Sequence, residues 1–194
     1  MTSQPDHWNA RRADARRNHE AVLAAAIEVF TEQGLEATIP EIAARAGVGK
    51  ATVYRSYPSK ADLIQAIAHQ GAEWIHGCLI EASRNPDPLA GIEEFLTATM
   101  TRLAGDKLMS DIFDSIDESG KLAHRDDERH REAESAIDSL LQRARDHGQI
   151  RTDITGFDIQ VMMGGCARSL MKLNIADPEV WQRYARLTLD ALRP

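Results

Sequence analysis

The sequence has little of what marks a secreted or membrane protein. It contains two cysteines, Cys78 and Cys166, and no run of about 18 uncharged apolar residues that could cross a bilayer. Residues 1–20 lack the apolar segment of a signal peptide. Two cysteines in a chain of this length indicate two buried thiols, although a pair that senses oxidation is an alternative. We therefore expect a cytoplasmic protein without membrane contact.

Aromatic residues and prolines are also scarce, at 5% of the chain and seven residues respectively. Alanine, leucine, isoleucine, glutamate, arginine and aspartate are abundant, and straight-chain residues lose little rotamer freedom in a helix. With 43% hydrophobic residues, the 194-residue chain can bury one good core or two small ones. The composition predicts an all-α fold.

Positive charge is in short supply overall, because the formal net charge is -7. This argues against general affinity for nucleic acid. The charge is unevenly placed: residues 1–60 hold eight Lys/Arg and seven Asp/Glu, a net +1, while residues 61–194 hold fifteen and twenty-three, a net -8. Any affinity for a polyanion therefore belongs to the opening third of the chain.

The opening third shows clear helix signals. Apolar residues recur at three- and four-residue steps in Val22, Leu23, Ala26, Ile27 and Phe30. This predicts a helix over about 17–33, which Gly34 ends. A second short helix begins after Thr38, whose hydroxyl can cap it while Glu41 reciprocates, and Gly47 ends it.

A third short helix fits residues 49–56 before Pro58, and Ser59 opens a fourth that continues to about residue 82. The segment "NPDP" at 85–88 is the clearest break in the chain, because each proline disfavours helical angles in the residue before it. Apolar periodicity predicts further helices near 89–103, 108–116, 133–144, 157–173 and 178–192, about nine in all.

The second and third helices, from Thr38 to Tyr57, are joined by a turn that contains glycine, as in a helix-turn-helix motif. A helix that enters a DNA groove must carry small and polar residues on its outer side. The third helix offers Lys50, Ala51, Thr52, Tyr54 and Arg55. Val48 and Val53 are expected to point inward. An ordinary polar surface helix is the alternative.

The span from about Arg17 to Ile75 resembles the DNA-binding domain of the tetracycline-repressor (TetR) family of bacterial transcriptional regulators. The matching segment is "AAIEVFTEQGLEATIPEIAARAGVGKATVYRSYPSKADLI", with "AGV", "TVY" and "PSK" at the spacing of the family. The resemblance implies three kinds of contact, in which Thr38 binds a phosphate, Thr52 and Tyr54 lie in or beside the groove, and Lys60 binds a backbone phosphate. Tyr57 completes the predicted DNA-binding set.

The sequence departs from many relatives at two places. Gly49 stands where many have serine, so the third helix lacks a hydroxyl cap, and Ser56 with Tyr57 stands where many have a His-Phe pair. These differences bear on the individual phosphate contacts. The resemblance also implies a division into a flexible basic arm over 1–16, a DNA-binding domain over 17–82 and an effector-binding and dimerisation domain over 83–194.

The arm contains Arg11, Arg12, Arg16 and Arg17. It could lie along a phosphate backbone or in a minor groove, or it could be a solubilising tail.

The family pairs its last two helices in a four-helix dimer interface and holds small inducers in the domain that contains them. The residues expected to pair two copies are Gly164, Gly165, Cys166, Leu170, Trp181, Tyr184, Thr188 and Leu192. The residues expected to line an effector pocket are Phe95, Met100, Leu103, Phe113, Ile137, Leu141, Met162 and Met163. In each case the alternative is plain core packing within one subunit.

A helical metal enzyme is the rival hypothesis from another class, because a bundle can hold metals with Glu-x-x-His motifs. Glu73 and His76 supply one such motif, but Asp127 stands where the second would need glutamate before His130. No catalytic motif or clustered cysteines appear. We expect no enzyme, metal or cofactor. The expected function is a repressor that binds a palindromic operator as a homodimer and is released by a small molecule. The alternative is a helix-turn-helix regulator that senses oxidation or acts without an effector.

Overall fold

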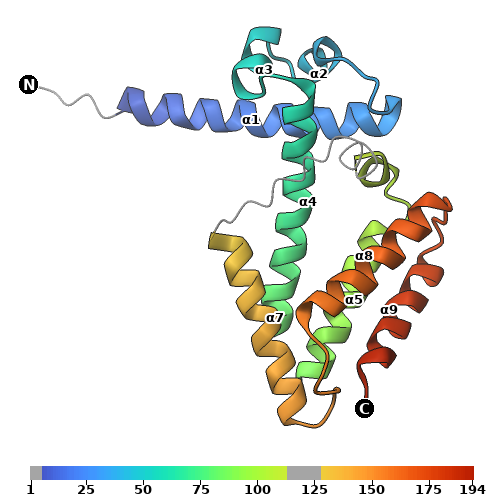
Figure 1. Ribbon diagram of the computed structural model, residues 1–194. Coiled ribbons are helices and arrows are strands. Elements are labelled where there is room, and N and C mark those ends of the chain that lie inside the picture. The colour runs from blue at the N-terminus through green and yellow to red at the C-terminus, as the bar shows by residue number, and fades with distance from the viewer. Residues whose placement is uncertain (1–5, 113–127) are drawn as a thin grey trace, which may run out of the picture.

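The computed structural model describes residues 6–112 and 128–194, and every regular element in those ranges is a helix (Figure 1). The helices are α1 (Asp6–Gln33), α2 (Ile39–Arg45), α3 (Lys50–Ser56), α4 (Lys60–Ser83), α5 (Pro88–Leu103), α7 (Glu128–Asp146), α8 (Gly156–Lys172) and α9 (Pro178–Leu192). Residues 107–112 are helical as well. The all-α prediction of about nine helices is confirmed. Within the described ranges, no helix combines the length and apolar composition needed to cross a bilayer.

The helix start that was predicted from Ser59 is confirmed. Ser59 precedes α4, and its backbone N–H donates to Oδ2 of Asp62 at 2.8 Å while the Asp62 N–H donates back to Ser59 Oγ at 3.2 Å. Thr155 and Asp158 form the same reciprocal pair before α8, at 2.8 and 3.3 Å. Such pairs satisfy amide groups that have no partner inside the helix. Local sequence therefore fixes where these helices begin.

The start of α1 differs from the prediction. The helix begins at Asp6, so residues 6–16 continue α1 and do not form a flexible arm. Arginine and alanine have high helix propensity, and Arg16 lies 3.6 Å from Glu20 one turn later. Extending an existing helix also avoids the cost of nucleation. The periodicity search missed this part because it has no apolar stripe.

The described residues build two apolar cores. The smaller core joins α1, α2, α3 and the first half of α4, through residues that include Phe30, Ile42, Val53 and Leu63. Leu108 and Ile112, which follow α5 in the chain, also belong to this core. The larger core joins the second half of α4 with α5, α7, α8 and α9 around Trp181.

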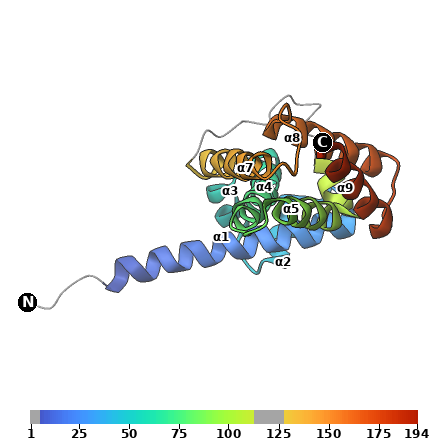
Figure 2. The ribbon, with the colours of Figure 1, turned by 90° about the horizontal axis from the view of Figure 1, so that it is seen from below.

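The arrangement follows from the length of α4. In Figure 1 this helix runs vertically, crosses α1 near its own start, and descends between α7 and α5. The helices α2 and α3 cover the far side of α1, and α8 and α9 pack beside α5 (Figures 1 and 2). The helix α4 ends at Ser83, and it contributes to both cores.

Candidate nucleic-acid interface

One side of α3 is anchored in the smaller core and the other is open. Val53 is fully buried, and Val48 packs against the same core from the preceding turn. The side chains of Lys50, Ala51, Tyr54 and Arg55 are exposed, and Thr52 is half-buried. Tyr54 exposes 48% of its surface. The structure therefore places these five predicted residues together on one short, uncovered helix.

The turn before α3 depends on glycine. Gly47 has φ +66°, in the left-handed region that favours glycine, and no atom would lie within 4 Å of an added Cβ. Glycine is therefore required at position 47 by the backbone conformation and not by a lack of space for a side chain. The Val48 N–H donates to the Ala43 carbonyl at 3.0 Å, which closes the end of α2. Gly49 is the N-cap of α3 and offers no side-chain cap, as its identity predicts.

An ion-pair network joins α2 to α1 behind this turn. The guanidinium of Arg45, at the end of α2, donates to Glu28 at 3.1 Å and to both carboxylate oxygens of Glu32 at 3.0 and 2.7 Å. The hydrogen bond from Arg45 lowers the pKa of Glu32 below its ordinary value. A forked guanidinium that bridges two carboxylates restricts the rotation of α2 against α1. This network helps to orient the helix-turn-helix.

Thr38 lies at the N-cap of α2 and is exposed, as a phosphate contact requires. Its hydroxyl and its backbone N–H both donate to Oε2 of Glu41 at 2.7 Å. The hydrogen bond from the Thr38 hydroxyl lowers the pKa of Glu41, and the one from the backbone N–H lowers it to a smaller extent. A hydroxyl has one proton to donate, so a phosphate at Thr38 would compete with Glu41 for it.

Tyr57 is not an exposed DNA contact, which corrects the prediction. Its side chain is buried in the smaller core and stacks on the His19 ring, with centroids 5.1 Å apart. The Tyr57 hydroxyl lies 3.1 Å from each ring nitrogen of His19. Burial raises the pKa of the phenol. A tyrosine in place of the family's phenylalanine keeps the packing and adds a polar link to α1.

Lys60 is the first residue of α4 and is half-buried, beside the turn that follows α3. Its helix starts with the Ser59 and Asp62 pair described above. The first turn of a helix presents backbone N–H groups that favour an anion. A lysine at this place suits a phosphate next to the half-site that α3 would contact.

Family models match both parts of the chain. The model described as "Bacterial regulatory proteins, tetR family" matches residues 22–67, and the model described as "Transcriptional regulator SbtR-like, C-terminal domain" matches residues 87–194. The chain belongs to the TetR family. It is a DNA-binding transcriptional regulator with a helix-turn-helix. The family is not enzymatic, and the prediction of a non-enzymatic protein is confirmed.

Individual relatives agree with this assignment. The chain is 31% identical over 110 residues to the transcriptional repressor BepR of Brucella suis, a match that covers 55% of this chain and about half, 53%, of BepR. It is 31% identical to the regulator TtgW of Pseudomonas putida, over 58% of this chain and 86% of TtgW. The solved structure of the TetR regulator SCO0520 from Streptomyces coelicolor superposes with a TM-score of 0.62, at 28% identity, over 90% of this chain and 98% of that one.

In this TetR-family chain, most of the residues predicted to pair two subunits face the subunit's own core. Leu170, Trp181, Thr188 and Leu192 are buried, and the Trp181 indole N–H donates to the Ile175 carbonyl at 2.7 Å. Cys166 and Tyr184 are half-buried against the same core. Gly164 and Gly165 are exposed. The other six residues form an apolar stripe that holds α8 and α9 to the rest of the subunit.

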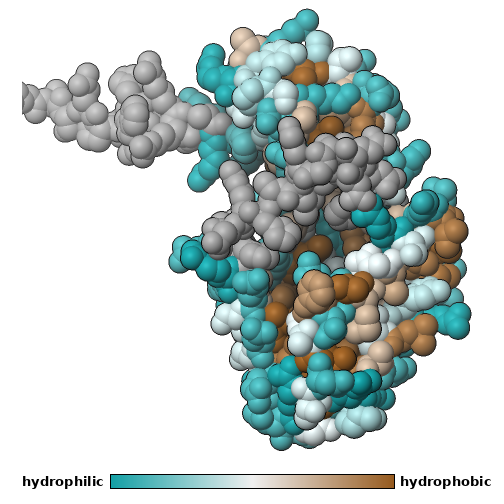
Figure 3. Space-filling view, viewed as in Figure 1, coloured by the Kyte–Doolittle hydropathy of each residue, from teal (hydrophilic) through white to brown (hydrophobic). Residues whose placement is uncertain are grey.

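A second apolar stripe on these helices is uncovered. Phe157 and Val161 on α8 expose 70% and 54% of their surface, and Leu187 on α9 exposes 49%. Figure 3 shows apolar surface over α8 and α9 on the right of the molecule. Phe157, Val161 and Gly164 follow one another at steps of four and three residues, so they share one face of α8. The sequence reasoning missed this stripe.

The predicted pocket residues are mostly core. Phe95, Met100, Leu141 and Met163 are buried. Leu103, Ile137 and Met162 are partly buried against the same core, and Phe113 lies outside the described residues. These side chains pack against one another in the larger core.

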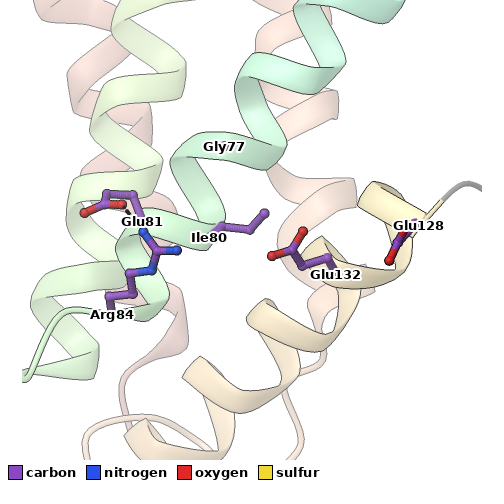
Figure 4. Close-up of a pocket in the computed structure, with 6 residues that line it drawn as sticks. All are labelled: Gly77, Ile80, Glu81, Arg84, Glu128 and Glu132. Atoms are coloured by element: carbon purple, nitrogen blue, oxygen red, sulfur yellow. Dashed lines mark hydrogen bonds and ion pairs between the residues drawn. The ribbon is translucent and has the colours of Figure 1, made fainter.

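A groove of about 440 Å³ lies instead between α4 and α7 (Figure 4). It is lined by Gly77, Ile80, Glu81, Arg84, Glu128 and Glu132. Figure 4 shows Ile80 pointing from α4 toward Glu132 of α7, while Glu81 and Arg84 pair at 2.8 Å. None of the predicted wall residues lines this groove.

The rival candidates are not brought together. Among the described residues, no three His, Cys, Asp or Glu side chains could jointly hold a metal ion. His76 and Glu73 are half-buried on α4, and Asp127 lies outside the described residues. Both cysteines are free and half-buried, and desolvation raises the pKa of each thiol. A raised pKa disfavours the thiolate that oxidation requires.

Proposed function

We propose that the protein is a transcriptional repressor that binds a palindromic operator as a homodimer and releases it when a small molecule binds the C-terminal domain. The observation that supports operator binding is the exposed side of α3, with cations and small residues outside and Val53 fixed inside. Small residues allow the backbone to approach base edges, and cations neutralise phosphates. One seven-residue helix contacts too few base pairs for specificity, so two copies are needed.

The dimer would form through the uncovered stripe of α8 and α9. Its members on α8 are Phe157, Val161, Gly164 and Gly165. Nothing in the subunit lies within 4 Å of a Cβ built on either glycine, so packing within the subunit does not call for them. Glycine inside a helix costs about 1 kcal/mol relative to alanine. Two glycines at this place would allow a helix of the partner subunit to approach α8 closely, which would offset that cost.

The effector site would involve the predicted wall residues of the larger core. Thr99 lies on α5 one turn after Phe95 and is buried, and within the described part of the chain its hydroxyl has no hydrogen-bond partner. A buried hydroxyl without a hydrogen-bond partner lowers the stability of the fold, and a bound ligand that bonds to it would remove this cost. An effector that separates these side chains and bonds to Thr99 would stabilise a second arrangement of the core.

The coupling would run through α4 and the helical segment 107–112. The second half of α4 packs in the larger core, and its first half, with Leu63 and Ile67, packs under the helix-turn-helix. Leu108 and Ile112 connect α5 to the same smaller core. A ligand that prefers one tilt of α4 would change the distance between the two α3 helices and lower operator affinity by its differential binding energy.

The test is selection from a pool of random-sequence duplexes by the full chain, followed by footprinting of the selected sequence. We expect an inverted repeat whose half-sites are one helical turn or a multiple apart, protected by a dimer. Selected sequences without symmetry, or no enrichment at all, would contradict the proposal. The Thr52→Ala variant should form dimers like the native chain but should enrich the operator sequence only weakly.

A further inference from the structure

The N-terminal half of α1 extends beyond the domain that it belongs to. Figures 1 and 2 both show these turns passing α3 and leaving the rest of the molecule. Among the side chains of this half that the structure describes, Asp14 and residues 16–21 are exposed, and Val22, which follows them, is buried. The exposed side chains of residues 16–21 contribute nothing to the core. The rigidity and direction of this half of α1 therefore call for another explanation.

The contact between His19 and Tyr57 fixes which side of the extension faces the helix-turn-helix. Tyr57 is the C-cap residue of α3, and its ring and hydroxyl meet His19 at 5.1 Å and 3.1 Å. Arg16 precedes His19 by three residues and so lies on the same side of α1, one turn further out. Arg12 precedes Arg16 by four residues, one more turn along the same continuous helix.

The charge of this segment is opposite to that of the chain. Residues 11–20 hold four arginines against two carboxylates, Asp14 and Glu20, whereas the whole chain has net charge -7. Arg16 lies 3.6 Å from Glu20, and Arg17 pairs with Asp14. Exposed ion pairs of this kind contribute little, so a phosphate can displace the carboxylate. Arginine binds phosphate through a planar fork of donors.

We propose that the N-terminal half of α1, residues 6–21, is a second DNA-contacting element that binds phosphates of the duplex beside the half-site read by α3. This rests on the proposed operator binding and adds a contact outside the sequence that α3 reads. From His19 to Asp6 the helix extends about 20 Å at 1.5 Å per residue. At about 3.4 Å per base pair, the contact reaches roughly six base pairs of flanking DNA.

The experiment compares two duplexes that carry the same selected operator. One ends at the outer edge of each half-site, and the other continues by about ten base pairs on both sides, which exceeds the reach of α1. The proteins are the native chain, the double variant Arg12→Gln with Arg16→Gln, and Arg151→Gln as a matched control. Arg151 is also exposed, and it pairs with Asp153 at 2.7 Å, but it precedes α8 in the C-terminal domain. Affinity is measured by fluorescence anisotropy over a series of salt concentrations.

The native chain should bind the long duplex more tightly than the short one, with a steeper dependence on salt. Removing four phosphate contacts per dimer should make the slope of log K against log salt shallower by about 3.6 on the long duplex. On the short duplex the double variant and the native chain should match. The control should follow the native chain on both duplexes.

Equal affinities and slopes for the native chain and the double variant on the long duplex would overturn the inference. Failure of the native chain to bind either duplex would instead overturn the proposed operator binding, so the two failures are distinguishable. Glutamine keeps a high helix propensity, and circular dichroism at 222 nm checks that α1 stays helical in the variant.

Discussion

The helices α3 and α8 each leave one side uncovered, and the chemistry of the two sides differs. On α3 the open side carries Lys50, Arg55 and the amphipathic ring of Tyr54, while Val53 holds the helix from below. On α8 it carries Phe157 and two glycines. The first surface suits a charged, hydrated groove, and the second suits another apolar helix. The exposed residues of each helix, which do not stabilise the subunit, thus determine which partner can bind to it.

The largest expected effect comes from the buried side of α9. Trp181→Ala removes a fully buried indole and its hydrogen bond to Ile175, and it should lower the free energy of unfolding by about 3–5 kcal/mol. Chemical denaturation measures this. A variant that keeps its stability but becomes monomeric would mean that Trp181 belongs to the dimer interface after all.

The open side of α8 should control association without changing the fold. Phe157→Glu with Val161→Glu should raise the dimer dissociation constant by at least about 100-fold, since each apolar side chain buries in two symmetric copies. Sedimentation velocity checks the mass, and Ser139→Glu on the exposed side of α7 is the matched control. A double variant that remains dimeric would remove this stripe from the interface.

The open side of α3 and the start of α4 should differ in their dependence on salt. Lys60→Ala should weaken operator binding and make the salt slope shallower by about 1.8, for two symmetric phosphate contacts. Tyr54→Ala should weaken binding with little change of slope, because it removes no cation. Arg151→Ala, which removes an exposed cation outside this surface, is the control. Unchanged affinity in both variants would remove these contacts from the interface.

Tyr57→Phe tests the link between α1 and α3 with a smaller effect. The ring stays buried and stacked, and the loss of the hydroxyl contact should cost about 0.5–1.5 kcal/mol of stability. Burial raises the pKa of Tyr57, so the native chain should lose stability as the pH rises above the ordinary value of 10.0. The variant should lack this alkaline loss. Thermal melts of both proteins between pH 8 and 11, about the range over which a phenol titrates, provide the comparison.

Glu41→Gln should have the smallest effect, and this effect should disappear in acid. Hydrogen bonds from Thr38 lower the pKa of Glu41, so its contribution is present above the ordinary value of 4.5 and is lost as the pH falls through the lower native value. The native chain and the variant should differ most at neutral pH and converge in acid. The same melts at a series of acid pH values measure this, and a constant difference would exclude Glu41 as the cause.

The sequence predicts best where the signal is local. Thr38 and Ser59 mark helix starts, and Gly47 marks a turn, because capping and left-handed backbone depend on residues within one turn. The polar side of α3 could be predicted for the same reason, since Val53 alone needs the core.

Prediction is harder where the residues of a helix suit both the subunit's own core and its surface. The helices α8 and α9 have two apolar sides, and the sequence does not say which one meets its own subunit. The larger residues, such as Trp181, fill the subunit core, so the smaller open stripe was overlooked. Tyr57 was misplaced because an amphipathic side chain suits both a surface and a core. The extension of α1 was not predicted because its sequence shows no apolar periodicity.

The division of α4 between the two cores has a practical consequence for engineering. The proline-rich turn at 85–88 looks like a natural place to exchange one sensor for another, yet a junction there would separate Leu108 and Ile112 from the partners they were selected to fit. A chimera that is meant to respond to a new inducer must therefore carry over, or redesign, those two contacts together with the first half of α4. Without these contacts, the chimera would bind its operator but would not respond to an inducer that binds the transplanted domain.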